Sequence, residues 1–148
     1  MLKLNKVCKR FGNKTVADDI CLTVDCGKIL AVLGRSGCGK STLLNMIAGI
    51  TRPDGGEIWL NGENITRMPP EKRRISLMFQ DYALFPHMSA LENTAFGLKM
   101  QKMQKTDAER LAMAALAEVG LENEAHRKPA TLSGGEKQRL ALARALVV

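Results

Sequence analysis

Aromatic residues are scarce in this chain of 148 residues: they make up 4% of it, as one Trp, one Tyr and four Phe. Proteins that bind single-stranded nucleic acid rely on aromatic rings on which the bases stack. The chain is basic, with 22 Lys and Arg against 15 Asp and Glu, but the positive residues are scattered, as in Lys72-Arg73-Arg74 and Arg127-Lys128. We therefore expect a protein with a basic surface and no nucleic acid among its partners.

Long apolar runs are also absent. The longest, Leu111 to Ala117, has seven residues, whereas a membrane-spanning helix needs about 18 or more. The segment from Met1 to Arg10 contains lysines but lacks the apolar core of a secretion signal. These absences predict a cytoplasmic protein that does not cross a bilayer by itself.

Cysteine pairs of the kind that bind zinc are missing. The four cysteines do not form a CxxC motif, and the two histidines lie far from them along the chain. This spacing argues against a zinc site, and reduced thiols are expected in the absence of a secretion signal. The cysteines are Cys8, Cys21, Cys26 and Cys38.

The first half of the chain carries the signals of β-strands. Apolar residues at Leu2, Leu4 and Val7, and alternating ones from Ile20 to Val24, indicate half-buried strands. The unbroken run Ile29–Leu33 predicts a strand buried on both faces, as in a parallel sheet. Three further segments predict two more strands and a hairpin turn: Ile58–Leu60, the turn Asn61-Gly62, and Ile75–Phe79.

Helix signals alternate with these strands and then take over. Apolar residues from Leu43 to Ala48 indicate a helix that ends at Gly49, and the spacing from Ala108 to Val119 indicates another that ends before Gly120. Capping boxes are predicted at Ser89-x-x-Glu92 and Thr106-x-x-Glu109, and a last helix is expected to begin near Ser133. The order of elements predicts an α/β fold.

A phosphate-binding loop follows the run Ile29–Leu33. The segment from Gly34 to Ser41 reads GRSGCGKS and matches GxxxxGK[ST] completely, between a predicted strand and a predicted helix. Glycines allow backbone N–H groups to approach phosphate oxygens, and the helix N-terminus adds partial positive charge. Lys40 would reach the β- and γ-phosphates, and the Ser41 hydroxyl would bind Mg²⁺. The residues expected to bind ATP here are Gly34, Ser36, Gly37, Cys38, Gly39, Lys40, Ser41 and Thr42.

Further motifs give the chain a resemblance to a known family. Leu132-Ser133-Gly134-Gly135-Glu136 is similar to the LSGGQ signature of ABC-type ATPases, with Glu in the last position, and Phe79-Gln80 resembles the Q-loop of that family. Phe11 falls where the family stacks an aromatic ring on adenine. The resemblance covers essentially the whole chain and implies a P-loop NTPase core with a β-subdomain and a helical subdomain.

The resemblance also implies roles for these residues. ATP would lie between two ABC subunits arranged head to tail, with Lys40 and Ser41 acting in cis. Gln80 would touch Mg²⁺ or the attacking water, so that Lys40 and Gln80 are the catalytic candidates and Ser41 and Gln80 the metal ligands. Residues Ser133, Gly134 and Gly135 would bind the γ-phosphate of the opposite subunit. Since Ser133-x-x-Glu136 also fits a capping box, both interpretations of this motif can hold.

The segment from Phe79 to Met88 resembles importer ATPases for polyamines, ferric iron, sulfate, maltose and related solutes. This subgroup implies integral membrane permease subunits as partners and a peripheral location on the cytoplasmic face of the inner or plasma membrane. The apolar residues of the segment fit two interpretations: a surface on which the permease docks, or packing inside the helical block. They are Tyr82, Leu84, Phe85 and Met88.

Acidic and histidine residues are missing after Glu136. In the family, an Asp-Glu pair of the Walker B strand and a switch histidine follow the signature. We therefore expect a partial ABC ATPase domain, cut after the signature motif and inactive in hydrolysis alone. Its expected parts are 1–79 (phosphate loop and β part), 80–132 (Q-loop and helical subdomain) and 133–148 (signature helix). The alternatives are a soluble ABC-type ATPase without a transport role and a non-enzymatic fragment.

Overall fold

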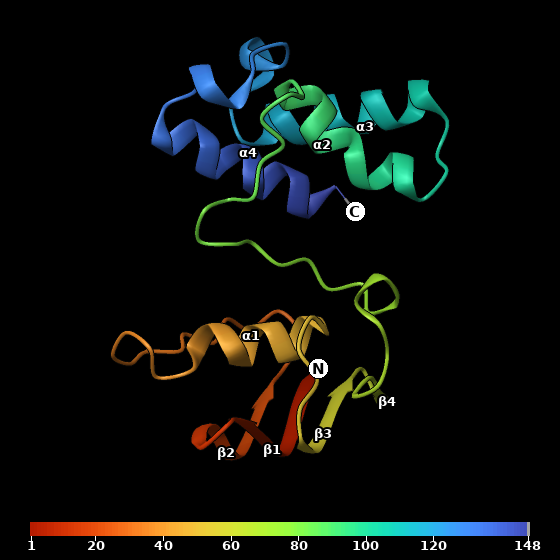
Figure 1. Cartoon of the computed structure of the whole chain (residues 1–148). Coiled ribbons are helices and arrows are strands. Elements are labelled where there is room, and N and C mark those ends of the chain that lie inside the picture. Colours follow the sequence, from red (N-terminus) through yellow and green to blue (C-terminus); the bar gives the residue numbers. More distant parts are fainter. Residues whose placement is uncertain (148) are drawn as a thin grey trace. The chain divides into compact units, whose positions relative to one another are not determined.

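The computed structural model describes residues 1–147 and divides the chain into two compact units, Met1–Ile75 and the part from Ser76 onward (Figure 1). Val148, the last residue of the expected signature helix 133–148, lies outside the described residues. Each unit has its own hydrophobic core, as expected for segments that fold separately.

The first unit is an antiparallel sheet covered on one face by a helix (Figure 1). Its order is β2-β1-β3-β4, and alternating apolar residues of the strands meet Met46 of the helix in the core. The predicted opening strands, the hairpin at Asn61-Gly62 and the helix stop at Gly49 are confirmed. The elements are β1 (Leu2–Phe11), β2 (Lys14–Val24), α1 (Lys40–Ala48), β3 (Gly55–Leu60) and β4 (Glu63–Asn64).

Two predicted strands are wrong. Neither Ile29–Leu33 nor Ile75–Phe79 is a strand, and the sheet of the described residues contains no parallel pair. A strand is defined by hydrogen bonds to a neighbour, and within residues 1–147 no strand lies beside either segment. The run Ile29–Leu33 is consequently exposed, Ile29 at 98% and Leu33 at 89%.

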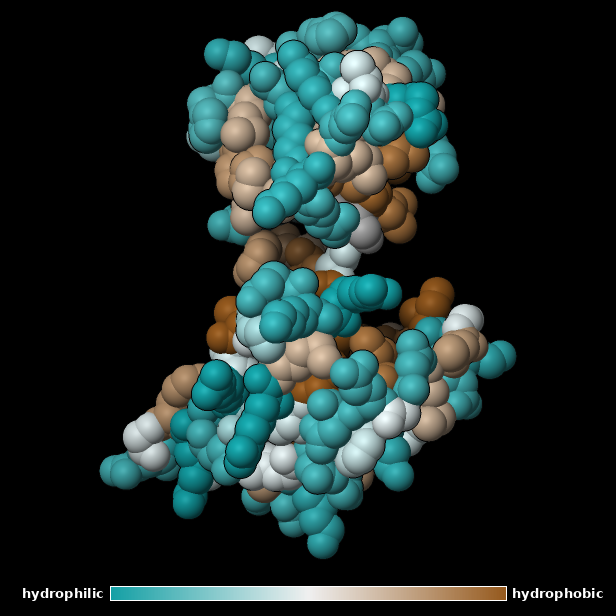
Figure 2. Space-filling view, turned by 90° about the vertical axis from the view of Figure 1, so that its right-hand side faces the viewer, coloured by the Kyte–Doolittle hydropathy of each residue, from teal (hydrophilic) through white to brown (hydrophobic). Residues whose placement is uncertain are grey.

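Hydrophobic side chains therefore reach the surface of the molecule, where Figure 2 shows them in brown among hydrophilic residues. Ile29 and Leu33 are the most exposed large hydrophobic residues in the described part of the chain. An apolar extended segment with free backbone N–H and C=O groups is a site at which another strand can pair.

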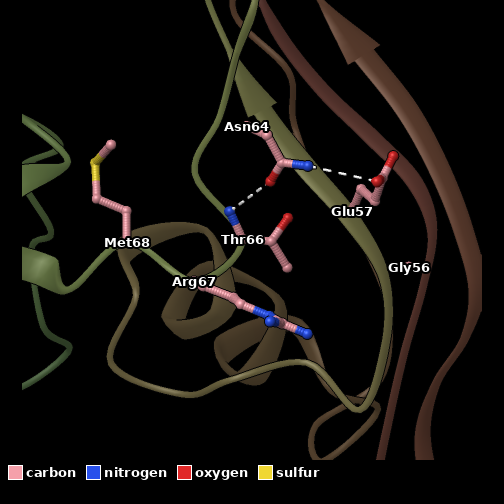
Figure 3. Close-up of a pocket in the computed structure, with 6 residues that line it drawn as sticks. All are labelled: Gly56, Glu57, Asn64, Thr66, Arg67 and Met68. Carbon is pink, nitrogen blue, oxygen red and sulfur yellow. Dashed lines mark hydrogen bonds between the residues drawn. The ribbon is translucent and has the colours of Figure 1, made fainter.

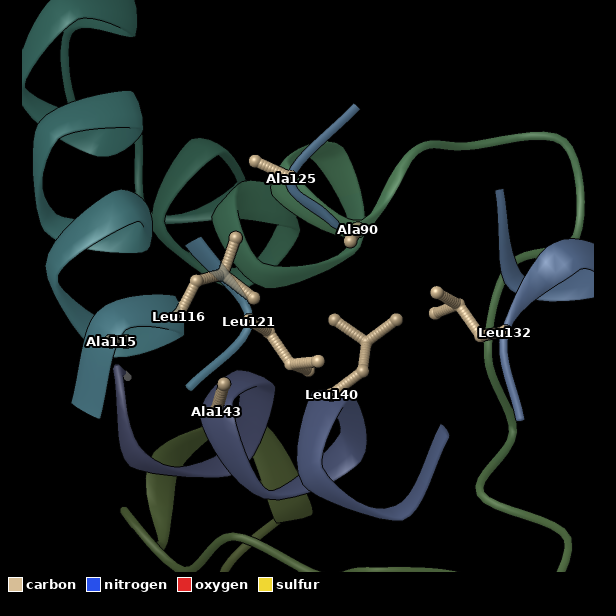
Figure 4. Packing of buried hydrophobic residues seen from close by; sticks show 8 residues of the cluster. All are labelled: Ala90, Ala115, Leu116, Leu121, Ala125, Leu132, Leu140 and Ala143. Carbon is tan, nitrogen blue, oxygen red and sulfur yellow. The ribbon is translucent and has the colours of Figure 1, made fainter. Parts of the chain in front are cut away.

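The second unit is helical, built from α2 (Ala90–Met100), α3 (Lys105–Glu118) and α4 (Gly134–Leu146). Its core combines leucines with alanines, whose small side chains let the helices approach closely (Figure 4). The first two amides of α2 donate to the carbonyl oxygens of Arg127 and Ala125, each at 2.8 Å, so the loop before α4 also caps α2. The core residues are Ala90, Ala115, Leu116, Leu121, Ala125, Leu132, Leu140 and Ala143.

Helix ends in this unit follow the sequence with one exception. The capping box of Ser89 and Glu92 is present, and Gly120 follows α3 with a left-handed φ of 66°, as predicted. The box predicted at Thr106 is wrong: α3 begins at Lys105, so Thr106 lies inside the first turn. The earlier start places Lys105 and Glu109 one turn apart, with their charged atoms 3.9 Å from each other. No helix in the described residues has the length and apolarity to span a membrane.

Candidate nucleotide-binding site

The phosphate loop folds around the side chain of Lys40. Its ammonium Nζ donates to the carbonyl oxygens of Gly34 at 2.8 Å and Arg35 at 2.7 Å, and lies 3.6 Å from the Sγ of Cys38. The positive charge therefore lies within the curve of the loop, where its acceptors are two uncharged carbonyl oxygens and a thiol. Phosphate oxygens are stronger acceptors for an ammonium than carbonyl groups, so an incoming phosphate can replace these bonds.

The helix that follows the loop begins without a side-chain cap. Gly39 is its N-cap residue, with a left-handed φ of 98°, and the first turn contains no acidic residue. Free N–H groups and the partial positive charge of the helix start are therefore available to an anion. Ser41, the second residue of α1, is exposed, and its hydroxyl is the hard oxygen ligand that Mg²⁺ prefers. Thr42 is half-buried beside it.

Two glycines of the loop have close neighbours, and at Gly39 the neighbour is backbone, which cannot turn aside as the Cys38 thiol beside Gly34 can. A Cβ on Gly34 would lie 2.8 Å from the Sγ of Cys38, and a Cβ on Gly39 would lie 2.6 Å from the carbonyl oxygen of Val16 in β2. Gly37 has a φ of 75° but open space around it, and Ser36 is exposed. The loop is thus seated against the sheet at Gly39 and open to solvent at its tip.

Phe11 ends β1 and is 52% exposed, so its ring lies at the surface. The ammonium of Lys9 lies 5.3 Å from the centre of the ring. Asp54 accepts from Lys9 Nζ and from the backbone N–H of Arg10, each at 2.8 Å, and the bond from Lys9 is the main reason why the pKa of Asp54 is lowered. These contacts fix the end of the strand that presents Phe11.

The signature motif forms the start of α4. The Oγ of Ser133 accepts from the N–H of Glu136 at 3.3 Å, and the carboxylate of Glu136 accepts from the N–H of Ser133 at 2.6 Å, which completes the predicted capping box. Because a hydroxyl can both accept and donate, the bond from the Glu136 N–H does not itself use the Ser133 hydroxyl proton. Gly134 and Gly135 supply the next two amides and are exposed. Capping and anion binding are therefore compatible at this helix start.

The capping box predicts a pH dependence. The N–H of Ser133 is the main cause that holds the pKa of Glu136 below its ordinary value. A lowered pKa means that the box stabilises the helix start above the unfolded-state pKa of about 4.3 and that this contribution is lost as pH falls through the lower folded-state value. In NMR, the Ser133 amide should titrate with a midpoint below about 4.3.

The reciprocal variants test this assignment. Glu136→Gln should abolish the titration of the Ser133 amide and leave that of Ser89, whose partner Glu92 has a pKa lowered in the same way. Glu92→Gln should do the reverse. A Ser133 amide that still titrates in Glu136→Gln would refute the box as the cause.

Gln80 lies exposed in a turn closed by the N–H of Tyr82, which donates to the carbonyl oxygen of Phe79 at 3.0 Å. The predicted site residues thus fall into two groups. Phe11 and the loop Gly34–Thr42 belong to the first unit, whereas Gln80 and Ser133–Gly135 belong to the second.

The apolar residues after Gln80 pack largely inside the helical unit. Leu84 contacts the core of that unit, and the ring of Phe85 lies 4.5 Å from that of Phe96. Tyr82 and Met88 are half-buried. For Leu84 and Phe85 the structure therefore favours the packing interpretation over a fully exposed patch.

Sequence reasoning missed three polar residues that organise these segments: Arg73, Asn93 and Arg144. Arg73 is 2% exposed and Asn93 is 0% exposed, although both are polar. The sequence did carry a sign that Arg144 is partly buried: it lies one helical turn after Leu140, on the apolar face of α4. A charged residue on an apolar face requires internal partners.

A separate cavity of about 410 Å³ lies beside β3 and β4 (Figure 3). The carboxylate of Glu57 accepts from the Nε1 of Trp59 at 3.1 Å and from the Nδ2 of Asn64 at 3.4 Å, so its oxygens already have partners within the chain. None of the predicted site residues lines this cavity, whose walls are Gly56, Glu57, Asn64, Thr66, Arg67 and Met68.

The motif GxxxxGK[ST], here at the start of a helix that packs on a sheet, is typical of the P-loop class of nucleotide-binding folds. The chain belongs to the ABC transporter family, whose sequence profile matches residues 17–148. The predicted α/β fold of an ABC ATPase core is thereby confirmed.

Individual relatives agree with this assignment. The chain is 48% identical over 147 residues to the spermidine/putrescine import ATP-binding protein PotA of Aggregatibacter actinomycetemcomitans, and 47% identical over 142 residues to the Fe(3+) ions import ATP-binding protein FbpC 1 of Rhizobium meliloti (strain 1021). These matches cover 99% and 96% of this chain but 40% of each relative's length.

Among solved structures, the chain resembles the ATP-binding cassette MJ0796, in a dimeric post-hydrolysis state bound to ADP and Pi. The TM-score is 0.87 at 32% identity, and the match covers 99% of this chain and 69% of the cassette.

Proposed function

We propose that this chain is the nucleotide-binding portion of the ATP-binding, energy-coupling subunit of an ABC importer. The observation that carries the proposal is the phosphate loop, which closes around the ammonium of Lys40 at a helix start without a side-chain cap. The names of the relatives, import ATP-binding proteins for polyamines and ferric ions, support the importer class.

The proposed ATP site uses the loop and α1. Amides of the loop and the Lys40 ammonium bind the phosphates, and the exposed Ser41 hydroxyl holds Mg²⁺, with Gln80 as its second protein ligand. The ring of Phe11 supports the adenine. When bound, Mg²⁺ neutralises charge on the phosphates. Hydrolysis belongs to the whole protein in this proposal, because no Asp, Glu or His follows Glu136 in this sequence.

The proposed assembly is a head-to-tail dimer of two such subunits on the cytoplasmic face of the membrane, in contact with permease subunits. The hydroxyl of Ser133 and the amides of the exposed residues Gly134 and Gly135 suit the γ-phosphate held by the opposite subunit. The dimeric state of the similar cassette supports this arrangement.

Lys40→Ala tests the nucleotide-binding proposal. Loss of a charge-assisted contact to phosphate of about 1.5–3 kcal/mol predicts a roughly 10- to 150-fold weaker affinity. Affinity is measured by titration with a fluorescent ATP analogue in the presence of Mg²⁺. The emission of Trp59, which lies in β3 of the same unit, should stay unchanged, since the Lys40 bonds join only residues of the loop.

The matched control is Lys28→Ala, which removes the charge of an exposed lysine ahead of the loop. It should bind the analogue as the unaltered chain does. Equal loss in both variants would mean that the analogue binds by general attraction to a basic surface, and unaltered binding by Lys40→Ala would refute the proposed site.

A further inference from the structure

The segment Tyr82–Met88, here named the post-Gln80 loop, has an unusual backbone. Tyr82 and Ala83 are consecutive residues with φ values of 62° and 44°, in the left-handed region that residues with a Cβ avoid. Two such residues in succession persist only where surrounding contacts hold them. Side-chain contacts from α4 hold this pair, and contacts from α2 hold the residues that follow it.

Arg144 of α4 holds the strained pair. Its Nη1 donates to the carbonyl oxygen of Ala83 at 2.7 Å and its Nη2 to that of Tyr82 at 2.8 Å. The guanidinium carbon also lies 5.5 Å from the centre of the Phe85 ring. A planar guanidinium can donate along two parallel directions and stack on a ring at once, whereas an ammonium is a point charge without this geometry.

Asn93 of α2 holds the remainder of the loop. Its Oδ1 accepts from the N–H of Phe85 at 2.8 Å, and its Nδ2 lies within 3.2 Å of the carbonyl oxygens of Phe85, Met88 and Ser89. Asn93 is fully buried, so these bonds are shielded from water. The Asn93 contacts begin at Phe85, so the side-chain hydrogen bonds to the backbone of Tyr82 and Ala83 come from Arg144, beside the bond from the Tyr82 N–H to Phe79.

The helix that carries Arg144 is the one that begins with the signature motif. Residues 134 and 144 lie in one continuous helix, about 15 Å apart along its axis. Its last turn is also joined to the start of the unit, because the Ser76 hydroxyl donates to the carbonyl oxygen of Ala145 at 2.8 Å. Arg144 is the side chain of α4 that hydrogen-bonds directly to the backbone of Tyr82 and Ala83.

We propose that Arg144 is a positioning residue, which imposes the left-handed conformation of Tyr82 and Ala83 and so makes the shape of the post-Gln80 loop depend on the signature helix. In the proposed importer subunit, this loop directly follows Gln80, so the inference rests on the proposed function for its physiological meaning. The structural claim, that Arg144 imposes the conformation of Tyr82 and Ala83, depends only on contacts within the helical unit and requires neither nucleotide nor permease.

The chain itself offers a selective probe, since Tyr82 is its only tyrosine. Incorporation of 3-fluorotyrosine gives a single ¹⁹F resonance from the post-Gln80 loop. Arg144→Met should move this resonance more than halfway toward its position in the urea-unfolded chain. Arg144→Lys, which keeps the charge but lacks the fork of donors, should give an intermediate shift.

Two variants serve as matched controls. Arg139→Met makes the same chemical change at an exposed position of α4, and Ser76→Ala removes the hydrogen bond to the same turn of the helix without touching the loop. Both should leave the resonance where it is in the unaltered chain.

The urea midpoint of the helical unit separates positioning from general stabilisation. A shifted resonance in Arg144→Met at a nearly unchanged midpoint supports the proposal. An unshifted resonance overturns it, and so does a shift that accompanies a fall of the midpoint in both Arg144→Met and Arg144→Lys. Lys40→Ala, by contrast, should leave the resonance unchanged, so failure of the nucleotide site is distinguishable from failure of this inference.

Discussion

Replacing Arg73 by Met is expected to destabilise the Met1–Ile75 unit by about 3 kcal/mol. Arg73 is 2% exposed and donates to four backbone carbonyl oxygens, those of Met46, Ile47, Thr66 and Met68, at 2.7–3.1 Å. Two of these oxygens belong to the last turn of α1, where carbonyl groups run short of helical partners, although that of Met46 also accepts from the Gly49 N–H at 3.2 Å. Met fills the space but removes the four donated bonds from these acceptors.

The size of this effect reflects two opposing terms. Burial lowers the pKa of Arg73, which shows that the charged group is held at a desolvation cost. Loss of that cost offsets part of the loss of four hydrogen bonds, so the net effect is smaller than their sum. Arg73→Lys keeps the charge with fewer directed donors and should recover only part of the stability.

Urea unfolding followed by Trp59 emission measures this effect, because Trp59 is the only tryptophan and lies in β3 of the same unit. The control is Arg74→Met at the neighbouring position, which is exposed and should change stability by less than about 0.5 kcal/mol. Equal unfolding midpoints for the two variants would contradict the assignment of Arg73 as the cap of α1.

The burial of Arg73 could not be predicted from the sequence. In Lys72-Arg73-Arg74 all three residues read as scattered surface charge, yet the structure buries the middle one. No local pattern encodes this, because its four acceptors come from α1 and from the loop 66–68, which lie far apart in the sequence. Asn93 and Arg144 are similar: each satisfies backbone groups of another segment, and propensity scales carry no information on such partners.

Features that depend on residues close together in the sequence were predicted correctly in most cases. A capping box joins residues three apart, a hairpin turn joins adjacent strands, and the phosphate loop is a contiguous motif, so each was visible in the sequence. The run Ile29–Leu33 has the composition of a buried strand, but strand formation depends on a neighbour that composition does not supply. The box at Thr106 failed because an earlier helix start was available at Lys105.

The second large effect is expected from Gly39→Ala. At a φ of 98° any Cβ is strained, and this one would also lie 2.6 Å from the carbonyl oxygen and 2.7 Å from the Cγ1 of Val16. The carbonyl is a backbone atom of β2 between Thr15 and Ala17, which pair with Arg10 and Lys9 of β1, so it can yield less easily than the end of a flexible side chain. We expect a loss of about 3–4 kcal/mol, of which roughly 1–2 is conformational strain.

Gly37→Ala separates the backbone strain of a left-handed residue from the steric contact with Val16, because only the strain is present at Gly37. Gly37 has a comparable φ of 75°, but nothing lies within 4 Å of the position that a Cβ would take there, so only the strain of about 1–2 kcal/mol is expected. Trp59 emission in urea gives both stabilities, and the fluorescent ATP analogue gives both affinities.

The two variants should separate folding from binding. Gly37 lies at the open tip of the loop, where a methyl group obstructs phosphate, so its variant should lose affinity while it stays folded. Gly39→Ala should lose both, because Gly39 joins the loop to the sheet and is the N-cap of α1. Similar stabilities for the two variants would mean that the loop moves freely away from Val16, and the fixed seating of the phosphate loop on the sheet would then be wrong.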